Sequence, residues 1–192
     1  MPSCGFVILL GFIMNIVKIS KYLSRHLRHQ PERLGIVLDE AGWVEVDVLL
    51  AACAAHGVAL SRAQLERVVA ENDKRRFAFS ADGTRIRASQ GHTVAVDLGL
   101  VEAVPPAVLF HGTNARSATA ISVEGLRPME RHDVHLSVDV ETARRVGARR
   151  GRPVVFAVRA ERMVADGHTF RRSDNGVWLV PAVPPEYLDR RD

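Results

Sequence analysis

The sequence has few cysteines and no recognisable metal-ligand motif. Cys4 and Cys53 are the two cysteines of the 192-residue chain, and they do not form a CxxC pair. A disulfide scaffold or a zinc ribbon is therefore not expected, and a reducing cytoplasmic compartment fits this cysteine usage. The eight histidines form no HExxH pattern or other close ligand spacing, so we expect no metal site.

The glycine motifs of common nucleotide-binding folds are also missing. The chain contains neither GxGxxG nor GxxxxGKS/T, so neither a Rossmann dinucleotide site nor a P-loop is supported. Charge of one sign does not dominate, because 26 basic and 22 acidic residues leave a formal net charge of +4. This mild excess favours a polyanionic partner only weakly, since many basic proteins bind nothing charged.

The one long apolar run is the N-terminal segment MPSCGFVILLGFIMNIV. Its length is near the lower limit for a membrane span. It has no basic residues at its start and no cleavage site, which disfavours a signal peptide. We interpret residues 1–17 as an apolar extension, either disordered or a start-site artefact with translation beginning at Met14, and we expect no membrane association.

Hydrophobic periodicity in the first half predicts several helices. Ile19, Tyr22, Leu23 and Leu27 follow the spacing of one helical face, and Pro31 should end this helix at the residue before it. The further features expected here are a buried anchor at Trp43, a helix over residues 45–56 ended by Gly57, and a helix capped by Ser61.

Two short alternating runs on either side of Asp82-Gly83 predict a β-hairpin. The second run places Arg85 and Arg87 on one side, where they are candidates for contacts with a phosphate backbone. Helices followed by a basic hairpin are typical of a winged helix, a common nucleic-acid-binding module. Small helical domains with one hairpin also form for packing alone, so the pattern does not establish a function.

A change in composition at Pro105-Pro106 predicts a domain boundary, with one domain over residues 18–104 and another over residues 107–192. In the second domain apolar stretches alternate with helical ones, which predicts a mixed α/β or α+β lobe. Strands are expected in AVLFHGT, VHLS, PVVFAVRAERMV and GVWLVPAV, and helices in ARSATAISVEGL and, after a capping Asp139, in DVETARRVGARRG.

Several short motifs, taken in order, resemble one family. They are SKYLSRHLRHQP at residues 20–31, NDKRRF at 72–77, QGH at 90–92, and LFHGT followed by MERHDVHLS. Each motif alone is weak. Their order and spacing, with NGVWL and VPPEYL near the C-terminus, are similar to those of the NAD-dependent RNA 2′-phosphotransferases, and the resemblance covers residues 19–188.

This resemblance implies both a fold and a reaction. The fold would be α+β, with an N-terminal winged-helix RNA lobe and a C-terminal ADP-ribosyltransferase-like NAD lobe. In the reaction, an internal RNA 2′-phosphate attacks NAD⁺ and expels nicotinamide, and the ribose 2″-hydroxyl then attacks the phosphate. The products would be 2′-OH RNA and ADP-ribose 1″,2″-cyclic phosphate, with NAD⁺ as a co-substrate and no metal.

The family's Arg-His-Arg-Arg set maps by resemblance onto Arg28, His29, Arg76 and Arg131. Arginine suits a phosphate clamp because it stays charged and its planar fork binds phosphate oxygens in pairs. We expect Arg28 and His29 in the last turn of a basic helix, pointing away from its buried stripe. The residues alone also fit a solvated helix end, and Arg131 could pair with a neighbouring acid. Whether His29 acts as a cation or moves a proton stays open.

Two of these assignments have an alternative in a neighbouring residue or pair. Arg25-His26 mimics Arg28-His29, but Pro31 follows the second pair at the family's distance, and His26 should border the core. Of Arg75 and Arg76, the residue directly before the phenylalanine matches the family, so Arg75 is expected on the surface.

For the NAD lobe, the resemblance implies two short motifs that contact the co-substrate. A glycine after a buried strand lets the backbone approach a flat amide such as nicotinamide. The alternative for His111 is a histidine packed at the end of a strand, and the alternative for Ser137 is the N-terminal boundary of the following helix. No acidic residue stands near GVWLV, which fits an acceptor that is already an anion. The NAD-binding candidates are His111, Gly112, Thr113, His135, Leu136 and Ser137.

RNA contacts are expected from Lys21, Arg25, Gln90 and His92, the last two at the seam between the lobes. The expected partners are NAD⁺ and a tRNA-like RNA that carries a 2′-phosphate, and we expect a monomer. Two other functions remain open. One is an ADP-ribosyltransferase that modifies phosphorylated nucleic-acid ends and stops after the first step. The other is a non-catalytic winged-helix nucleic-acid-binding protein.

Overall fold

The computed structural model describes residues 15–72 and 74–191 of the chain. Residues 1–14 of the expected extension lie outside this part. The first helix already begins at Ile16, where Asn15 accepts a hydrogen bond from the Lys18 backbone N–H at 3.0 Å. Residues 16 and 17 are therefore helical, and the predicted end of the extension at residue 17 is too late. Within the described residues, no helix is long and apolar enough to span a bilayer.

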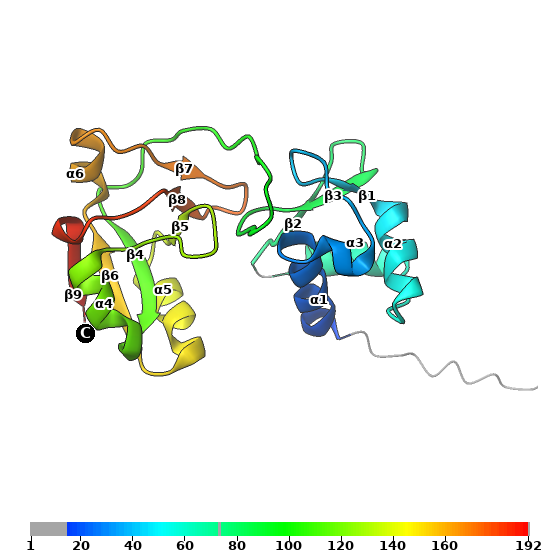
Figure 1. The fold of residues 1–192 in the computed structure, drawn as a ribbon, viewed down its shortest axis with the longest axis horizontal. Coiled ribbons are helices and arrows are strands. Elements are labelled where there is room, and N and C mark those ends of the chain that lie inside the picture. The colour runs from blue at the N-terminus through cyan, green and yellow to red at the C-terminus, as the bar shows by residue number, and fades with distance from the viewer. Residues whose placement is uncertain (1–14, 73, 192) are drawn as a thin grey trace, which may run out of the picture.

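The first half combines three α-helices with a small antiparallel sheet (Figure 1). The strand order is β1-β3-β2, so the last strand of the hairpin lies in the middle. The predicted hairpin and the Ser61 cap are confirmed, the latter as a full capping box with Gln64. The elements are α1 (Ile16–Arg28), the 3₁₀ turn η1 (Pro31–Leu34), β1 (Val44–Glu45), α2 (Val46–Ala55), α3 (Arg62–Ala70), β2 (Phe77–Phe79) and β3 (Arg85–Ala88).

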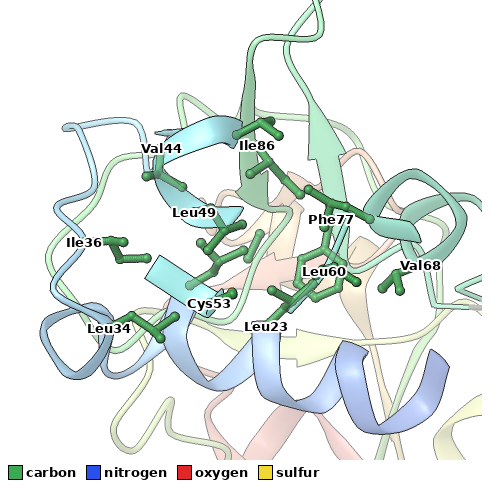
Figure 2. Close-up of a cluster of buried hydrophobic side chains, with 14 residues drawn as sticks. Leu23, Leu34, Ile36, Val44, Leu49, Cys53, Leu60, Val68, Phe77 and Ile86 are labelled. Atoms are coloured by element: carbon green, nitrogen blue, oxygen red, sulfur yellow. The ribbon is translucent and has the colours of Figure 1, made fainter. Parts of the chain in front are cut away.

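The helices and the sheet of this half enclose one hydrophobic core, drawn in Figure 2. Leu23 and Leu27 on α1 are fully buried, and Ile19 and Tyr22 pack against the same cluster, as the helical spacing predicted. Burying one such leucine contributes about 1.5–3 kcal/mol. This core anchors α1, and therefore also fixes the direction in which its last residue points.

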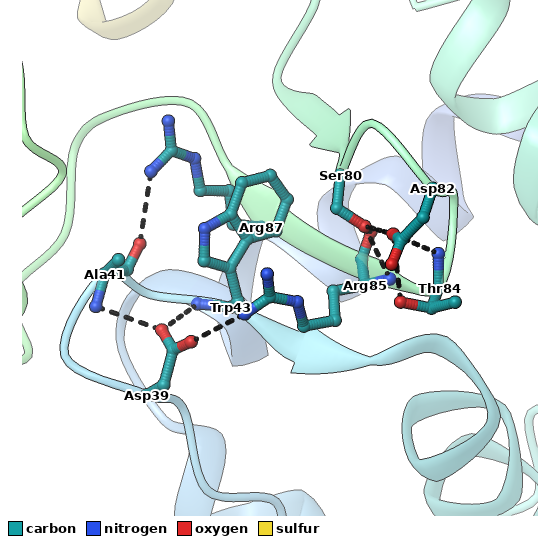
Figure 3. A network of polar contacts seen from close by, with 8 residues as sticks. All are labelled: Asp39, Ala41, Trp43, Ser80, Asp82, Thr84, Arg85 and Arg87. Carbon is teal, nitrogen blue, oxygen red and sulfur yellow. Dashed lines mark hydrogen bonds and ion pairs between the residues drawn. The ribbon is translucent and has the colours of Figure 1, made fainter.

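Trp43 is not the buried anchor that the sequence suggested. It is half-buried, and its ring lies beneath two guanidinium groups, those of Arg87 at 4.5 Å and Arg85 at 5.6 Å (Figure 3). Arg85 also pairs with Asp39 at 3.3 Å. Arg87 donates to the Leu98 carbonyl at 3.3 Å, so it fastens the connecting segment to β3. The arginine stem covers apolar surface while the charge meets the indole face, which stabilises a tryptophan near the surface.

The second half contains two three-stranded antiparallel sheets, in the orders β4-β6-β9 and β5-β8-β7. Paired backbone hydrogen bonds between Phe110 and Ser137 join β4 to β5. The elements are β4 (Leu109–Asn114), α4 (Ala115–Glu124), β5 (Val134–Leu136), α5 (Val140–Gly147), η2 (Ala148–Arg150), β6 (Pro153–Val158), α6 (Ala160–Ala165), β7 (Arg171–Arg172), β8 (Trp178–Val180), η3 (Pro185–Tyr187) and β9 (Leu188–Arg191).

Most of the predicted elements of this half are present, and one prediction is wrong. Asp139 caps α5 with a 2.7 Å bond to the Thr142 N–H, as expected. The stretch PVVFAVRAERMV is not a single strand, because β6 ends at Val158 and α6 follows. Alanine, glutamate, arginine and methionine are strong helix formers, and Met163 is fully buried on the inner face of α6. The chain therefore has a mixed α/β fold, as predicted.

Gly112 on β4 lies against the backbone of α5. A Cβ atom there would lie 1.6 Å from the carbonyl oxygen of Ala143. Gly147, at the other end of the same contact, would place a Cβ 2.4 Å from the Thr113 carbonyl oxygen. The missing side chain at position 112 is therefore required for close packing of α5 on β4.

The two halves have separate hydrophobic cores, and residues 89–108 connect them (Figure 1). Two polar contacts also cross between them: Arg87 pairs with Asp174 at 3.5 Å, and Asn175 Nδ2 donates to the Lys74 carbonyl at 3.0 Å. The division into domains over residues 18–104 and 107–192 stays a prediction. The residues of interest lie where the two halves meet.

Candidate functional site

Arg28 ends α1 as a buried cation. It is 9% exposed, so the expectation that it points away from the buried face is wrong. One guanidinium nitrogen, Nη2, donates to the Arg76 carbonyl at 3.4 Å, and Nε is buried without a hydrogen-bond partner. Arg28 makes no ion pair with any residue of the described part of the chain. Burial, and then the charges of Arg76 and Arg131, lower the pKa of Arg28 to about 10.

A buried cation among other cations is unfavourable unless an anion joins it. Arg76 and Arg131 are 48 and 103 positions further along the chain than Arg28, yet both charges act on its guanidinium. The fold therefore brings three of the four predicted phosphate-binding residues together. Their arrangement predicts an anionic ligand.

Arg76 is held in place by two buried polar residues that the sequence analysis did not single out. Its Nη1 donates to Asn72 Oδ1 at 3.0 Å and to Ser20 Oγ at 3.3 Å. Asn72 Nδ2 in turn donates to Ser20 Oγ at 2.6 Å, and both residues are buried. Ser20 and Asn72 each begin one of the motifs that carry the resemblance to the family, and this position was the only signal in the sequence that could have pointed to them. Arg75, as predicted, is exposed.

Arg131 joins the site from the loop before β5. Its Nη1 lies 2.9 Å from His135 Nδ1, and because a guanidinium can only donate, His135 accepts at this nitrogen. His111 Nδ1 lies 3.1 Å from the His135 carbonyl oxygen, so His111 carries its proton on Nδ1. Burial, and then Arg131, lower the pKa of His135 to about 3. Burial also lowers the pKa of His111, so both imidazoles are neutral at pH 7.

His29, the fourth predicted residue, caps α1 directly beside Arg28. Its Nδ1 lies 3.1 Å from Thr93 Oγ1 in the connecting segment. Burial lowers its pKa, followed by the charges of Arg28 and Arg131, while Glu130 opposes them. The position of His29 thus depends on α1 and on the connecting segment, and its pKa depends also on the loop that carries Arg131.

Gln90, Gly91 and His92 line a pocket of about 60 Å³ between the connecting segment and the second half. His92 is 2% exposed, and neither of its ring nitrogens has a hydrogen-bond partner. Burial, and then the charge of Arg28, lower its pKa to about 4. Gly91 has a φ of +86°, and a Cβ there would lie 3.3 Å from His135 Cε1 and 3.8 Å from Arg28 Nη1. The pocket therefore adjoins the arginine cluster.

Four further polar residues line this pocket and were not among the candidates predicted from the sequence. They are Asp97, His132, Asp133 and Arg171, and the last two form a partly buried ion pair at 2.7 Å. His132 and Asp133 lie inside the MERHDVHLS motif, next to residues that were selected. Arg171 could not be found this way, because nothing in its local sequence separates it from Arg172. Among the described residues, no group of three or more His, Cys, Asp or Glu side chains could hold a metal ion.

Other candidates lie away from the site or serve packing. Lys21 and Arg25 are exposed on the outer side of α1, and Arg25 donates to Gln30 Oε1 at 2.7 Å. Leu136 is 1% exposed in the core, so its side chain does not face a ligand. Gly112 is required by α5. Thr113 lines the same strand–helix contact, and Ser137 pairs through its backbone with Phe110.

His26, of the alternative pair Arg25-His26, points into its own half. Its Nδ1 donates to the Gln30 carbonyl at 3.1 Å, and its ring packs edge-on against Tyr22 with centroids 4.6 Å apart. His26 is buried within its own half, as expected for a residue bordering the core. Arg28 and His29, rather than Arg25 and His26, face the arginine cluster.

Comparisons with known proteins identify the family of the chain. The sequence model of the "RNA 2′-phosphotransferase, Tpt1 / KptA family" matches residues 14–182. The chain belongs to this RNA 2′-phosphotransferase family. A protein of Streptomyces coelicolor named "Probable RNA 2′-phosphotransferase" is 66% identical over 172 residues, which is 90% of this chain and 93% of the relative. Proteins with the same name from Trichormus variabilis and Burkholderia pseudomallei are 60% and 54% identical, over 90% and 89% of the chain and 94% and 93% of their own lengths.

The buried neutral histidine of this RNA 2′-phosphotransferase family member makes its stability depend on pH. Because the pKa of His92 is about 4 in the folded state and near 6.5 when unfolded, the unfolded state binds the extra proton below pH 6.5. The free energy of unfolding should therefore fall between pH 6.5 and 4, by up to about 1.4 kcal/mol per pH unit for this one proton. Urea unfolding of the wild type and of His92→Gln at pH 7, 5.5 and 4.5 measures it.

The variant should lose less stability on acidification than the wild type. It will retain a smaller slope, because His111 and His135 also have lowered pKa values. Identical pH profiles for the two proteins would mean that His92 is not buried as a neutral group.

Proposed function

We propose that the protein removes an internal 2′-phosphate from RNA by transferring it to NAD⁺. The observation that carries the proposal is Arg28, a buried guanidinium that has Arg76 and Arg131 beside it and pairs with no carboxylate of the described residues. A phosphate monoester carries between one and two negative charges at neutral pH and matches this charge deficit. Membership of the RNA 2′-phosphotransferase family supports the same ligand.

In the first step, a 2′-phosphate oxygen bonds to the ribose carbon that carries nicotinamide, and the carbon–nitrogen bond to nicotinamide breaks. The acceptor is already an anion, so no base is needed to activate it. Arg28 and Arg76 hold the phosphate from the first half, and their role is to align the attacking oxygen. Arg76 is suited to this because Asn72 and Ser20 fix its guanidinium group.

In the second step, the ribose 2″-oxygen bonds to phosphorus and the bond between phosphorus and the RNA 2′-oxygen breaks. The proton of the 2″-hydroxyl ends on the RNA 2′-oxygen, so RNA with a 2′-OH and ADP-ribose 1″,2″-cyclic phosphate leave. Arg131 stabilises the charge on the phosphoryl oxygens, because it can point its remaining donors at them. His29, beside Arg28, is placed to hydrogen-bond the phosphate or to carry the proton.

The second half is proposed to hold NAD⁺, with an ADP-ribosyltransferase-like arrangement of its two sheets, and the first half to bind RNA as a winged helix. The strand order β1-β3-β2 behind three helices supports the latter. His111 is suited to the nicotinamide ribose, because its Nδ1–H is fixed on the His135 carbonyl and its other nitrogen is an acceptor. We further propose a cytoplasmic monomer whose partners are NAD⁺ and a tRNA-like RNA.

The test is an incubation of the protein with a synthetic RNA that carries one internal 2′-phosphate. With NAD⁺ present, the RNA should lose its 2′-phosphate and one ADP-ribose cyclic phosphate should form for each RNA. Mass spectrometry of both products measures this balance, and the same RNA without the 2′-phosphate is the control. Unchanged RNA, with no rise in melting temperature on adding NAD⁺, would instead support a non-catalytic nucleic-acid-binding protein.

A different outcome separates the remaining alternative. An enzyme that stops after the first step would accumulate ADP-ribosylated RNA and release nicotinamide without the cyclic product. The position of Arg131 within the cluster favours the complete reaction, since its charge acts on Arg28 and His29.

A further inference from the structure

The turn between β7 and β8 contacts the loop that carries Arg76, although the two are about one hundred residues apart. Asn175 Nδ2 donates to the carbonyl oxygen of Lys74 at 3.0 Å. Because a carbonyl only accepts, the amide must present its nitrogen to Lys74. The other end of the amide, Oδ1, lies 2.6 Å from the hydroxyl of Ser173, which is 3% exposed. The side chain of Asn175 is therefore held in one orientation.

The receiving loop has an unusual backbone conformation. Arg75, between Lys74 and Arg76, has a φ of +41°, in the left-handed region that a non-glycine residue seldom adopts. Such a conformation costs roughly 1–3 kcal/mol and persists only where the surroundings impose it. Ser89 donates to the Arg75 carbonyl from Oγ at 3.1 Å and to the Arg76 carbonyl from its backbone N–H at 2.9 Å. Asn175, in the second half, donates a further hydrogen bond to the same loop.

The loop matters because its geometry decides where the Arg76 guanidinium lies. Asn72 accepts both from the Lys74 backbone N–H, at 3.1 Å, and from Arg76 Nη1, at 3.0 Å. A shift of Lys74 would therefore displace the same side chain that orients Arg76. Asn175 contacts Lys74 on its carbonyl side, so Lys74 is fixed by one residue from each half.

We propose that Asn175 is a positioning residue that sets Arg76 at the phosphate site by holding Lys74 across the junction. Arg76 then reaches its working position only when the half that carries Arg131 is in place. The inference rests on the proposed function for the role of Arg76, but the contact itself can be tested without it. A contact that served packing alone would affect stability and leave the arginine unmoved.

Asn175→Asp is the sharpest variant, because it keeps the size of the side chain and replaces the donor by an oxygen that faces a carbonyl. Single-turnover reaction of 2′-phosphorylated RNA with NAD⁺ should slow by about tenfold or more, since small misplacements of a reacting group have effects of this order. The neighbouring Asp174→Asn is the matched control. It weakens another polar contact between the halves, the pair with Arg87, and should retain the wild-type rate within about twofold.

A double-mutant cycle separates positioning from packing. If Asn175 acts through Arg76, Asn175→Asp should slow the Arg76→Lys enzyme much less than it slows the wild type. Equal effects in both backgrounds would overturn the proposal. Equal loss of rate in Asp174→Asn would do so as well, because the effect would then come from any contact between the halves.

Hydrogen exchange distinguishes a failure of this inference from a failure of the proposed function. Asn175→Asp should speed exchange of the peptide covering residues 72–77, and Asp174→Asn should not. If the wild type is inactive but shows this exchange pattern, the proposed reaction is wrong and the positioning contact is still supported. Unchanged exchange in Asn175→Asp would remove the positioning contact, whatever the reaction.

Discussion

Replacing Arg28 by methionine is expected to lower the rate of the proposed reaction by about a hundredfold or more while raising the melting temperature of the free protein. The loss of rate follows because a preorganised donor for a phosphate is removed. The gain in stability follows because a buried cation that pairs with no carboxylate in the described part of the chain is unfavourable, and methionine fills similar space without charge. Most substitutions of buried residues destabilise, so the opposite signs of the two effects are specific to an anion site.

The measurement pairs kinetics with thermal unfolding in chloride and in inorganic phosphate. Phosphate should raise the melting temperature of the wild type, because it binds only the folded state, and should have a much smaller effect on the variant. Lys18→Met is the control, since it removes an exposed cation from the same helix. A variant that keeps its phosphate-dependent shift would show that the anion binds elsewhere.

Gly112→Ala is expected to destabilise the protein by more than about 3 kcal/mol, at the upper end of the effects of overpacking. The added Cβ would lie 1.6 Å from the Ala143 carbonyl oxygen, and backbone cannot yield as a flexible side chain would. β4 or α5 must therefore move, which separates the strand that carries His111 from its neighbours. Urea unfolding of the variant and the wild type measures the difference.

Gly167→Ala provides the comparison. Gly167 has a φ of +91° but no atom within 4 Å of the added Cβ, so this variant reports the backbone effect alone, about 1–2 kcal/mol. A similar loss in both variants would mean that the contact between β4 and α5 relaxes easily. In that case glycine at position 112 would be required by a bound ligand and not by packing against α5.

Local patterns predicted the helices and the hairpin where packing and local preference agree. The buried face of α1, the Ser61 cap and the Asp139 cap all depend on residues a few positions apart. The prediction of strand beyond Val158 is wrong, although Arg159, Glu161 and Arg162 interrupt the apolar run of β6 there. What decides the helix there is the burial of Met163 against another part of the chain.

The candidate site shows the same division. The motifs identified the arginines and histidines, but Arg28 is buried among residues far from it in the sequence, such as Arg76 and Gly91, which no local pattern encodes. Arg171 was beyond reach for the same reason, since its partner Asp133 is 38 positions away. Gly112 was predicted to contact NAD⁺, and the structure shows that it packs against α5. A glycine in a motif indicates a close approach, but it does not reveal which neighbour comes close.

The buried imidazoles of His92 and His135 stay neutral over the pH range in which the proposed reaction would be measured. With the pKa of His92 at about 4 and that of His135 at about 3, neither ring gains a proton between pH 5 and 8. Arg28 keeps its charge over the same range, because its pKa is about 10. The charges of His92, His135 and Arg28 are therefore almost constant over this range, whereas a phosphate monoester takes up its second proton near pH 6. An acidic limb in a rate profile near that value would accordingly belong to the RNA phosphate or to His29, and not to His92, His135 or Arg28.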